Sequence, residues 1–406
     1  MPQLSTITIE EATERLIDYR GRTPPKTDSG VRLITAKVVK SGHILDEPKE
    51  FIAADFYDEW MRRGLPQNLD VLLTTEAPLG EVAILRDDER IALAQRIILL
   101  RAKPGHIDPQ FLFYALQSGY AQGELRARAS GTTVLGIKQS ELRQVRIPTF
   151  PLPVQQQIAG ILSAYDELIE NNQRRIMILE TMARALYRVW FVEFRFPGHQ
   201  KIPRVASPLG DIPKGWEVRA VGAIAESMRR NVPKGDLDEP KPYVGLEHIP
   251  RRSLALDAWE MTADLGSNKL EFRKGEILFG KIRPYFHKVS VAPFDGVCSA
   301  DTIVIRARRP EDHAFLVASV SSDAFVAEAS ATANGAKMPR ANWDVLENYQ
   351  VVMPEGTLAT RFSTLFSDIL GAQQALIFQI QNLRRTRDLL LPRLLSGQVA
   401  LTDTAA

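Results

Sequence analysis

A long heptad pattern near the middle of the chain constrains the fold more than any other feature. Between Pro151 and about Trp190, apolar side chains recur every seven residues in adjacent columns, which predicts one long amphipathic helix. A helix of roughly 38 residues is about 57 Å long, whereas helices of compact domains average about 11–12 residues. A helix of this length needs a partner of similar length to cover its apolar stripe.

The chain contains such a partner between Leu358 and Leu395, where Phe362 corresponds to Ile158, 204 residues earlier. Two equivalent helices in one chain predict an antiparallel coiled coil. The seam residues predicted are Ile158, Leu162, Tyr165, Ile169, Ile176, Leu179 and Leu186 in the first helix and Phe362, Phe366, Ile369, Leu376, Ile380, Leu383 and Leu390 in the second. A further apolar column of the first helix contains Ile161, Leu168, Met182 and Val189.

Two polar residues interrupt the heptad columns, Asn172 in the first helix and Gln373 in the second. A single buried polar residue fixes the register of a coiled coil. Alternatively, both side chains lie at the edge of the stripe and face water.

Composition places the chain among globular proteins. With 406 residues, 45% hydrophobic and 25% charged, we expect two or three domains. The single cysteine, Cys298, excludes an internal disulfide and a Cys-based zinc cluster, and a small buried residue is favoured over a nucleophile. The N-terminus has no basic and apolar leader, and no run of 18 apolar residues occurs, so we expect a cytoplasmic protein.

The repeat extends into the segments before each long helix. Residues 9–21 and 218–230 predict short helices, and residues 31–44, 69–85 and 93–102 match the extended runs 242–254, 275–291 and 299–308. Residues 111–118 and 315–322 predict helices, and Gly-centred loops follow at 130–142 and 334–346. Short apolar runs bounded by Gly, Pro, Asn and Asp are typical of mixed α/β domains with a curved sheet.

The predicted organisation alternates globular units and helices. We expect globular units at 1–150 and 215–355, long helices at 151–195 and 356–399, a Pro/Gly-rich linker at 196–214 and a C-terminal tail at 400–406. The formal net charge is only +2, but residues 126–146 and 269–288 are locally basic. Such clusters are either nucleic-acid surfaces or ordinary solvated faces.

Several stretches in this order resemble the specificity subunit of type I restriction-modification systems. They are RGRTPPKTDSGVRLITAK (20–37), IPTFPLPVQQQIAGIL (147–162), PKGWEV (213–218) and LLLPRLLSGQV (389–399), together with the repeated two-unit plan. Each stretch alone is a weak signal, but their order and spacing across nearly the whole chain are specific. The second junction, VVMPEGTLATRF, lacks the Pro-x-x-x-Gln-Gln pattern of the first.

The resemblance implies a fold and a set of partners. Each globular unit would be a target recognition domain that reads one half of a bipartite, asymmetric double-stranded DNA sequence, and the helices would set the distance between the halves. Two methyltransferase subunits would bind this chain, joined by ATP-driven restriction subunits where these are present. S-adenosylmethionine, ATP and Mg would then be cofactors of the partner subunits.

Candidate DNA-binding residues follow from the chemistry of groove readout. Arg or Lys contacts guanine, Asn or Gln contacts adenine, acids contact cytosine, and Ser, Thr, Arg or Lys anchors phosphate. In the first unit the candidates are Arg22, Thr23, Lys26, Thr74, Thr75, Glu76, Gln95, Arg96, Ser130, Thr132, Thr133, Lys138 and Gln139. In the second they are Arg229, Arg230, Lys234, Lys281, Arg283, Tyr285, Asp301, Thr302, Asn334, Lys337, Arg340 and Asn342. Alternatively, the Gly and Thr residues of these loops only make turns.

Catalytic patterns do not occur in the sequence. The chain has no Asn-Pro-Pro-aromatic methylation motif, no phosphate-binding loop and no His pair with metal-ligand spacing. Asp70, Glu76 and Glu81 suggest a nuclease carboxylate group, but the second copy has Glu276, Ile282 and His287 at those positions. The sequence therefore favours a non-catalytic recognition subunit. The alternatives are a coiled-coil scaffold with duplicated protein-binding domains and, less favoured, a stand-alone nuclease or methyltransferase.

Overall fold

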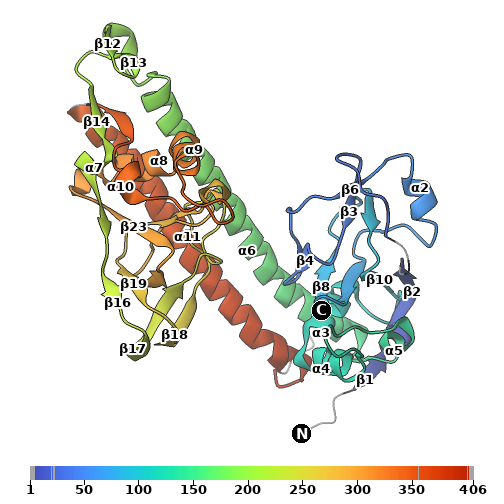
Figure 1. The fold of residues 1–406 in the computed structure, drawn as a ribbon. Coiled ribbons are helices and arrows are strands. Elements are labelled where there is room, and N and C mark those ends of the chain that lie inside the picture. Colours follow the sequence, from blue (N-terminus) through green and yellow to red (C-terminus); the bar gives the residue numbers. More distant parts are fainter. Residues whose placement is uncertain (1–4, 20, 22, 355, 400, 402–406) are drawn as a thin grey trace. The chain divides into compact units, whose positions relative to one another are not determined.

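The two heptad stretches form the two long helices of the computed structural model (Figure 1). Helix α6 spans Leu152–Tyr187 and continues into the π-helical turn η1 (Arg188–Val192), and α11 spans Thr357–Leu395. The structure describes residues 5–19, 21, 23–354, 356–399 and 401. Apart from residue 401, the predicted C-terminal tail 400–406 lies outside the described residues.

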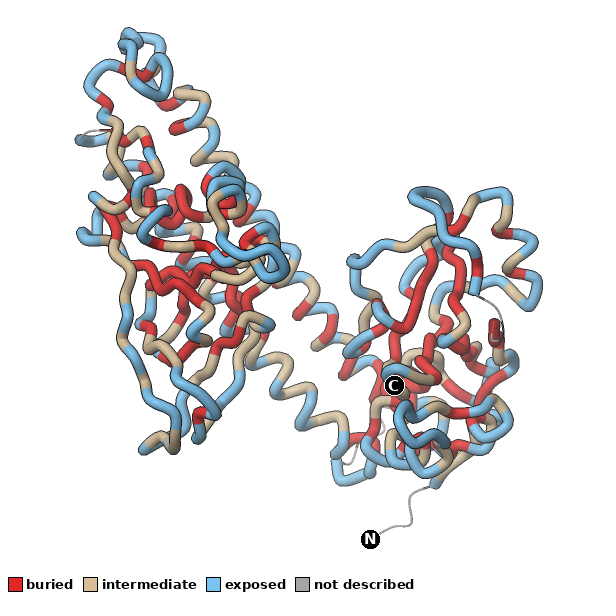
Figure 2. The backbone as a smooth tube through the Cα atoms, in the orientation of Figure 1, coloured by how far each residue is buried: buried red, intermediate tan, exposed pale blue. Residues whose placement is uncertain are grey.

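The chain divides into two compact units, and each contains parts of both long helices. The first unit comprises Met1–Glu167 and Leu383–Ala406, and the second comprises Leu168–Asn382. Buried backbone gathers in the central strands of each unit (Figure 2). The predicted fold class, two repeated mixed α/β domains with two long helices, is confirmed.

Short strands and helices alternate in the first unit. They are β1 (Thr6–Thr8), α1 (Ile9–Ala12), β2 (Thr13–Asp18), β3 (Val31–Ile34), β4 (Val39–Lys40), β5 (His43–Ile44), β6 (Phe51–Ile52), α2 (Tyr57–Trp60), β7 (Val71–Thr75), β8 (Leu79–Ile84), β9 (Ile91–Leu93), β10 (Ile97–Ala102), α3 (Pro109–Gln117), α4 (Gly119–Ala127), α5 (Gln139–Arg143) and β11 (Arg146–Pro148).

The second unit has a similar series between the long helices. It consists of η2 (His199–Lys201), β12 (Arg204–Ser207), β13 (Gly210–Pro213), β14 (Glu217–Ala220), α7 (Val221–Ile224), β15 (Ala225–Met228), β16 (Asn231–Val232), β17 (Gly235–Val244), β18 (Glu260–Leu265), β19 (Lys269–Phe272), β20 (Ile277–Gly280), η3 (Pro284–Phe286), β21 (Val289–Val291), β22 (Gly296–Ser299), β23 (Thr302–Ala307), η4 (Pro310–Asp312), α8 (His313–Val320), α9 (Asp323–Ala331), α10 (Trp343–Leu346) and β24 (Gln350–Met353).

Sheet topology repeats between the two units. The four-stranded sheet β2-β10-β7-β8 corresponds to β15-β23-β20-β21, and the pair β1-β11 corresponds to β14-β24. A second sheet in each unit contains one parallel pair, β3 with β9 in the first and β17 with β22 in the second. The internal repeat read from the sequence is therefore a repeat of strand order and strand direction.

The short helices predicted at 9–21 and 218–230 are wrong over most of their length. Helix α1 ends at Ala12, and β2 then pairs antiparallel with β10, where Leu16 lies opposite Leu100. In the second unit, α7 is equally short and β15 pairs with β23. Strand pairing in the tertiary structure overrides the local helical pattern here.

The Pro- and Gly-rich segment predicted as a linker contains regular structure. Strands β12 and β13 form an antiparallel hairpin within it. At its two ends, the rings of Phe196 and Trp216 stack with centroids 4.9 Å apart, and both residues belong to the apolar core of the second unit. The segment is thus attached to the second unit at both ends.

In the second unit, α6 and η1 pack along α11 through an aromatic cluster. Phe191 contacts Phe362 edge to face at 4.6 Å and Phe315 of α8 at 5.0 Å, and Phe362 and Phe366 are each 1% exposed. All the predicted seam residues of both helices are buried or half-buried. In the further apolar column, however, Leu168 and Met182 are each 53% exposed, so the buried stripe is narrower than the heptad pattern suggested.

The two polar residues of the heptad columns are buried in the second unit. Asn172 is 7% exposed and donates from Nδ2 to Oε1 of Gln379 at 3.4 Å, and Gln373 is 2% exposed. The alternative in which both side chains face water is therefore wrong. A buried amide at a helix seam favours the register in which it has a partner, as Asn172 does.

In the first unit, a buried ionic cluster joins the helices to the domain. Asp166 of α6 is 3% exposed, accepts a hydrogen bond from Nη1 of Arg387 of α11 at 2.6 Å and another from the Tyr114 hydroxyl at 2.6 Å. Burial, with the adjacent Asp166 carboxylate, raises the pKa of Tyr114, so the hydroxyl stays protonated and donates. The equivalent residues of the second unit are Leu370, Ala183 and Ala318, which all lie in its apolar core.

This cluster yields a stability prediction for the first unit. Arg387→Ala leaves the Asp166 carboxylate buried without its cation, so we expect a loss of about 3–5 kcal/mol. Thermal unfolding and hydrogen exchange of residues 152–167 measure the effect. The double variant Asp166→Leu/Arg387→Ala, which copies the side chains of the second unit, should recover most of the loss, and Arg385→Ala, at an exposed position, is the control. Equal losses in the single and double variants would contradict the assignment.

Candidate nucleic-acid interface

The Gly-centred loop of the first unit, residues 130–138, is closed by its own backbone. Ser130 N donates to Gly136 O at 2.8 Å and Gly136 N donates to Ser130 O at 2.9 Å. Gly131 has φ +120°, and a Cβ there would lie 2.2 Å from the carbonyl oxygen of Val134. Only glycine fits this corner, because an L side chain would be strained and would collide with backbone.

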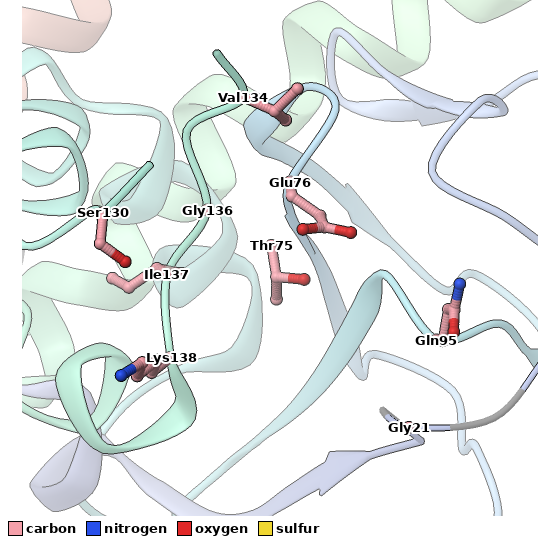
Figure 3. A pocket seen from close by; sticks show the side chains of 9 residues that line it. All are labelled: Gly21, Thr75, Glu76, Gln95, Ser130, Val134, Gly136, Ile137 and Lys138. Atoms are coloured by element: carbon pink, nitrogen blue, oxygen red, sulfur yellow. The ribbon is translucent and has the colours of Figure 1, made fainter. Parts of the chain in front are cut away.

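This loop packs against the ends of two central strands. Ile137 N donates to Thr75 O at 3.0 Å, and Thr75 N donates to Arg96 O at 2.9 Å. The junction borders a pocket of about 320 Å³ lined by Gly21, Thr75, Glu76, Gln95, Ser130, Val134, Gly136, Ile137 and Lys138. Figure 3 shows Glu76 and Thr75 pointing between the loop and the segment that carries Gln95.

The second unit builds the same junction from different side chains. Asn334 N donates to Arg340 O at 3.0 Å and Arg340 N donates back to Asn334 O at 2.8 Å. Ala341 N donates to Lys281 O at 2.9 Å, and Lys281 N donates to Asp301 O at 2.8 Å. Gly335 again has a positive φ, +105°. The two loops are therefore structural equivalents and not two unrelated turns.

The structure brings many of the candidate DNA-binding residues to these junctions. Thr75, Gln95, Ser130 and Lys138 line the pocket, and the exposed loop positions are Ser130, Thr132, Thr133, Lys138, Asn334, Lys337 and Arg340. Gln139 begins α5, and Asn342 caps α10 by accepting from Asp344 N at 3.2 Å. Lys281 and Asp301 are half-buried beside the second loop, and Arg96 is exposed beside the first.

Other candidates lie outside the junctions or are engaged in the fold. Thr74, Thr75 and Thr302 are 0–2% exposed, and Thr74 Oγ1 donates to Pro78 O at 2.7 Å, so Thr74 is a structural residue. Lys26 pairs with Glu50 at 2.8 Å, and Arg229 pairs with Asp344 at 3.4 Å. Thr23, Lys234 and Tyr285 are exposed, and Arg22 lies outside the described residues. Arg283 is half-buried next to the second loop, where its backbone N donates to Pro339 O at 2.8 Å.

The exposed apolar residues at the loop tips were absent from the sequence-based candidates. Val134 is 52% exposed, Leu135 49% and Met338 49%. A sequence signal existed, since apolar residues within a Gly-bounded polar loop have no local core to fill. Apolar side chains contact the thymine methyl group in the major groove, so these tips are suited to base contact.

The acidic residues considered for a nuclease are committed to ion pairs or backbone contacts. Asp70 is 2% exposed and pairs with Arg101 at 2.7 Å, and its counterpart Glu276 is 5% exposed and pairs with Arg230. Glu81 accepts from Ser41 N at 2.7 Å. Arg230, a DNA-binding candidate, thus compensates a buried carboxylate. Among the described residues, no group of three or more His, Cys, Asp or Glu side chains is arranged to hold a metal ion.

The remaining reactive or apolar features are parts of the core. Cys298 is fully buried, and burial raises the pKa of its thiol to about 12, so it is a structural residue.

Within the described ranges, no single helix is long and apolar enough to cross a membrane. One bent pair of helical segments passes a test of length and composition, Pro310–Val320 with Asp323–Ala331, and most of its apolar side chains lie in the core of the second unit.

The glutamine run at the start of α6 has a structural role. Gln155 is 1% exposed, accepts from Asp108 N at 2.9 Å through Oε1, and donates from Nε2 to Phe150 O at 2.7 Å. Its counterpart in the second unit is Ala359, which lines a small pocket of about 20 Å³ next to Asp312. The two helix starts therefore differ because one is anchored by a buried amide and the other is not.

Comparisons with known proteins agree with this geometry. Residues 37–181 match the family model of the type I restriction modification DNA specificity domain. The chain is 26% identical to the type I restriction enzyme MjaIX specificity subunit of Methanocaldococcus jannaschii over 348 residues, 82% of this chain and 78% of that one. It is 24% identical to the EcoDI specificity subunit of Escherichia coli over 275 residues, 62% of this chain and 60% of that one.

A solved structure supports the same fold. The type I restriction-modification S subunit of M. genitalium aligns with a TM-score of 0.59 at 17% identity, covering 98% of this chain and 97% of that one. The matched range includes the Gly-centred loop of the first unit and every residue that lines the pocket except Gly21. On these matches, residues 37–181 correspond to a type I restriction modification DNA specificity domain, and most of the chain is similar to type I restriction enzyme specificity subunits.

Proposed function

We propose that this chain is the DNA-recognition subunit of a type I restriction-modification complex, and that each unit reads one half of a bipartite target. The observation that carries the proposal is the repeated junction. Both units place a Gly-cornered loop against the same two strand ends, with exposed polar, cationic and apolar side chains at the loop. Such loops supply both the phosphate contacts and the base contacts that sequence recognition requires.

The proposed target is asymmetric because the two junctions differ in side chains. Thr133 and Lys138 of the first loop correspond to Lys337 and Asn342 of the second. Lysine contacts guanine and asparagine contacts adenine in the major groove. Two domains with the same backbone and different donors and acceptors would therefore prefer different half-sites.

Catalysis, on this proposal, belongs to partner subunits. Two methyltransferase subunits would bind this chain and methylate adenine with S-adenosylmethionine, and restriction subunits, where present, would use ATP and Mg. The location we propose is the cytoplasm, where these subunits meet DNA. The second candidate, a scaffold with duplicated protein-binding domains, predicts no DNA affinity in the loops.

Methylome sequencing tests the proposal directly. A host that carries this chain with its methyltransferase subunit should show adenine methylation within a split motif, and deletion of the chain should abolish that methylation. Exchange of residues 1–150 for the equivalent unit of a relative should change one half of the motif only. Methylation that is independent of the chain, in a strain where the two proteins co-purify, would argue for the scaffold.

Alanine at the glycine corners separates the two half-sites. Gly131→Ala should distort the first loop, because its Cβ meets the Val134 carbonyl oxygen at 2.2 Å, and should weaken specific DNA binding at least tenfold. Gly335→Ala should act on the second half-site, more mildly, since the closest contact there is 3.3 Å. Gly123→Ala is the matched control, because it lies in α4 with nothing within 4 Å of the added Cβ. Competition binding against single-half mutant DNA reports which half is lost, and equal effects of all three variants would refute the assignment.

The exposed apolar residues of α6 are the proposed methyltransferase contacts. Met177, Ile178 and Met182 are 53–59% exposed on the helix in the second unit. The double variant Ile178→Glu/Met182→Glu should weaken the methyltransferase complex roughly 30-fold, since important interface residues each contribute more than about 1 kcal/mol. Met261→Glu, at a position 61% exposed on β18, is the control. Calorimetric titration with the methyltransferase subunit measures the affinity of the double variant and of the control. Equal affinities of these two proteins would show that the methyltransferase binds elsewhere.

A further inference from the structure

The repeated junction defines three equivalent positions in each unit. The residue before the strand β10 or β23 accepts a backbone hydrogen bond, Arg96 O from Thr75 N and Asp301 O from Lys281 N. The residue after Thr75 or Lys281 forms a backbone bridge with the Gly loop, Glu76 with Gly136 and Ile282 with Arg340. Position 96 thus corresponds to 301, position 76 to 282, and position 136 to 340.

Both units hold one ion pair at this junction, but they build it from different positions. In the first unit, Nε of Arg96 lies 2.8 Å from Oε1 of Glu76. In the second, Nη2 of Arg340 lies 3.4 Å from Oδ1 of Asp301. In the second unit, the acidic residue occupies the position equivalent to Arg96, and the arginine occupies the position equivalent to Gly136. Both units therefore contain an arginine–carboxylate pair, although the equivalent positions carry different residues.

Stability does not account for this recurrence. The side chains of Arg96 and Glu76 are 47% and 43% exposed, and those of Arg340 and Asp301 are 50% and 37% exposed. Half-exposed ion pairs contribute little to folding because water screens them and the long side chains lose entropy. The presence of an ion pair in both units is better explained by a ligand that binds its exposed groups.

The geometry leaves the arginine available for a ligand. Arg96 uses Nε for Glu76, and within the described part of the chain its two terminal nitrogens have no other ion-pair partner. Arg340 pairs with Asp301 through Nη2, so its Nε and Nη1 remain on the side away from that contact. A guanidinium kept near a carboxylate by charge attraction can still present two N–H groups to O6 and N7 of guanine. We propose that Arg96 and Arg340 each read one guanine, in the first and second half-site respectively, with Glu76 and Asp301 as positioning residues. This inference rests on the proposed DNA-recognition function.

The proposal has consequences that other roles of the same residues do not share. A bidentate arginine–guanine contact discriminates against other bases by roughly 5- to 150-fold at that base pair. An arginine that contacted phosphate would instead weaken binding equally for all sequences and reduce its salt dependence. A purely structural pair would change thermal stability and leave base preference intact.

The experiment uses the complex of this chain with its methyltransferase subunits and the target defined by methylome sequencing. Each half-site is randomised one base pair at a time, and relative binding is measured for the parent chain, Arg96→Ala, Arg340→Ala, Glu76→Ala and Asp301→Ala. Arg90→Ala and Arg219→Ala are matched controls, because these arginines are 54% and 40% exposed and pair with Asp58 and Glu217 outside the junctions. Thermal unfolding of every variant identifies loss of structure.

We expect Arg96→Ala to relax a single G·C position in one half-site by roughly 5- to 150-fold and to leave the other half unchanged. Arg340→Ala should do the same in the other half, and Glu76→Ala and Asp301→Ala should relax the same positions less. Arg96→Lys should retain part of the preference for guanine. The controls should change no position.

Three results would overturn the inference. They are a parent half-site without any G·C pair, a uniform loss across all sequences, and an unchanged preference at every position. Each of them leaves the bipartite target of the parent chain in place, so the proposed function survives. A parent complex with no sequence preference at all would instead reject the proposed function.

Discussion

The fold depends on the fact that neither domain closes its core without the long helices. In the second unit, Phe191 and Phe362 interlock with Phe315 of α8, with ring centroids 4.6 and 5.0 Å from Phe191. In the first, Ile158 and Leu162 of α6 belong to the same buried cluster as Phe111 of α3 and Leu394 of α11. Edge-to-face aromatic pairs and close packing favour one orientation of each domain on its helices. A polar anchor adds to this in the second unit, where the buried Glu180 of α6 accepts from Leu254 N at 2.6 Å.

Shared backbone and divergent side chains run through the whole repeat. Gln155 anchors one helix start, whereas Ala359 leaves a small pocket at the other. The ionic cluster of Asp166, Arg387 and Tyr114 has an apolar equivalent in the second unit. Replacement of buried ion pairs by apolar residues of suitable shape is often neutral for stability. The two copies have therefore kept the strand order while changing the chemistry that holds helix to domain.

The sequence predicted the structure correctly where a short repeat of apolar residues determines it. The prediction failed where pairing between strands distant in the sequence determines it. Five heptads of apolar residues determine a long helix regardless of context, and α6 and α11 lie where the pattern placed them. Residues 9–21 were misread because Thr13–Asp18 pairs with β10, which is distant in the sequence, and forms a strand there. The heptad pattern also predicted too wide a buried stripe, because Leu168 and Met182 are exposed. The pattern marks the apolar face of a helix but does not show how much of that face the partner helix covers. At the site, the spacing of the Gly-centred loops was visible, but the pairing of Arg96 with Glu76 depends on β7 and β10 being neighbours.

Gly136 illustrates how the side chains of the junction can change while its backbone is kept. Backbone hydrogen bonds and a glycine corner hold the junction, and neither depends on the side chains at positions 76, 96 and 136. A Cβ at Gly136 would meet Glu76 at 3.4 Å, an ordinary van der Waals contact, so the backbone accepts a side chain there. In the second unit an arginine occupies this position, and the residue equivalent to Glu76 is the uncharged Ile282. The acid then comes from Asp301 instead, so each unit accommodates an arginine–carboxylate pair although different segments supply the two charges.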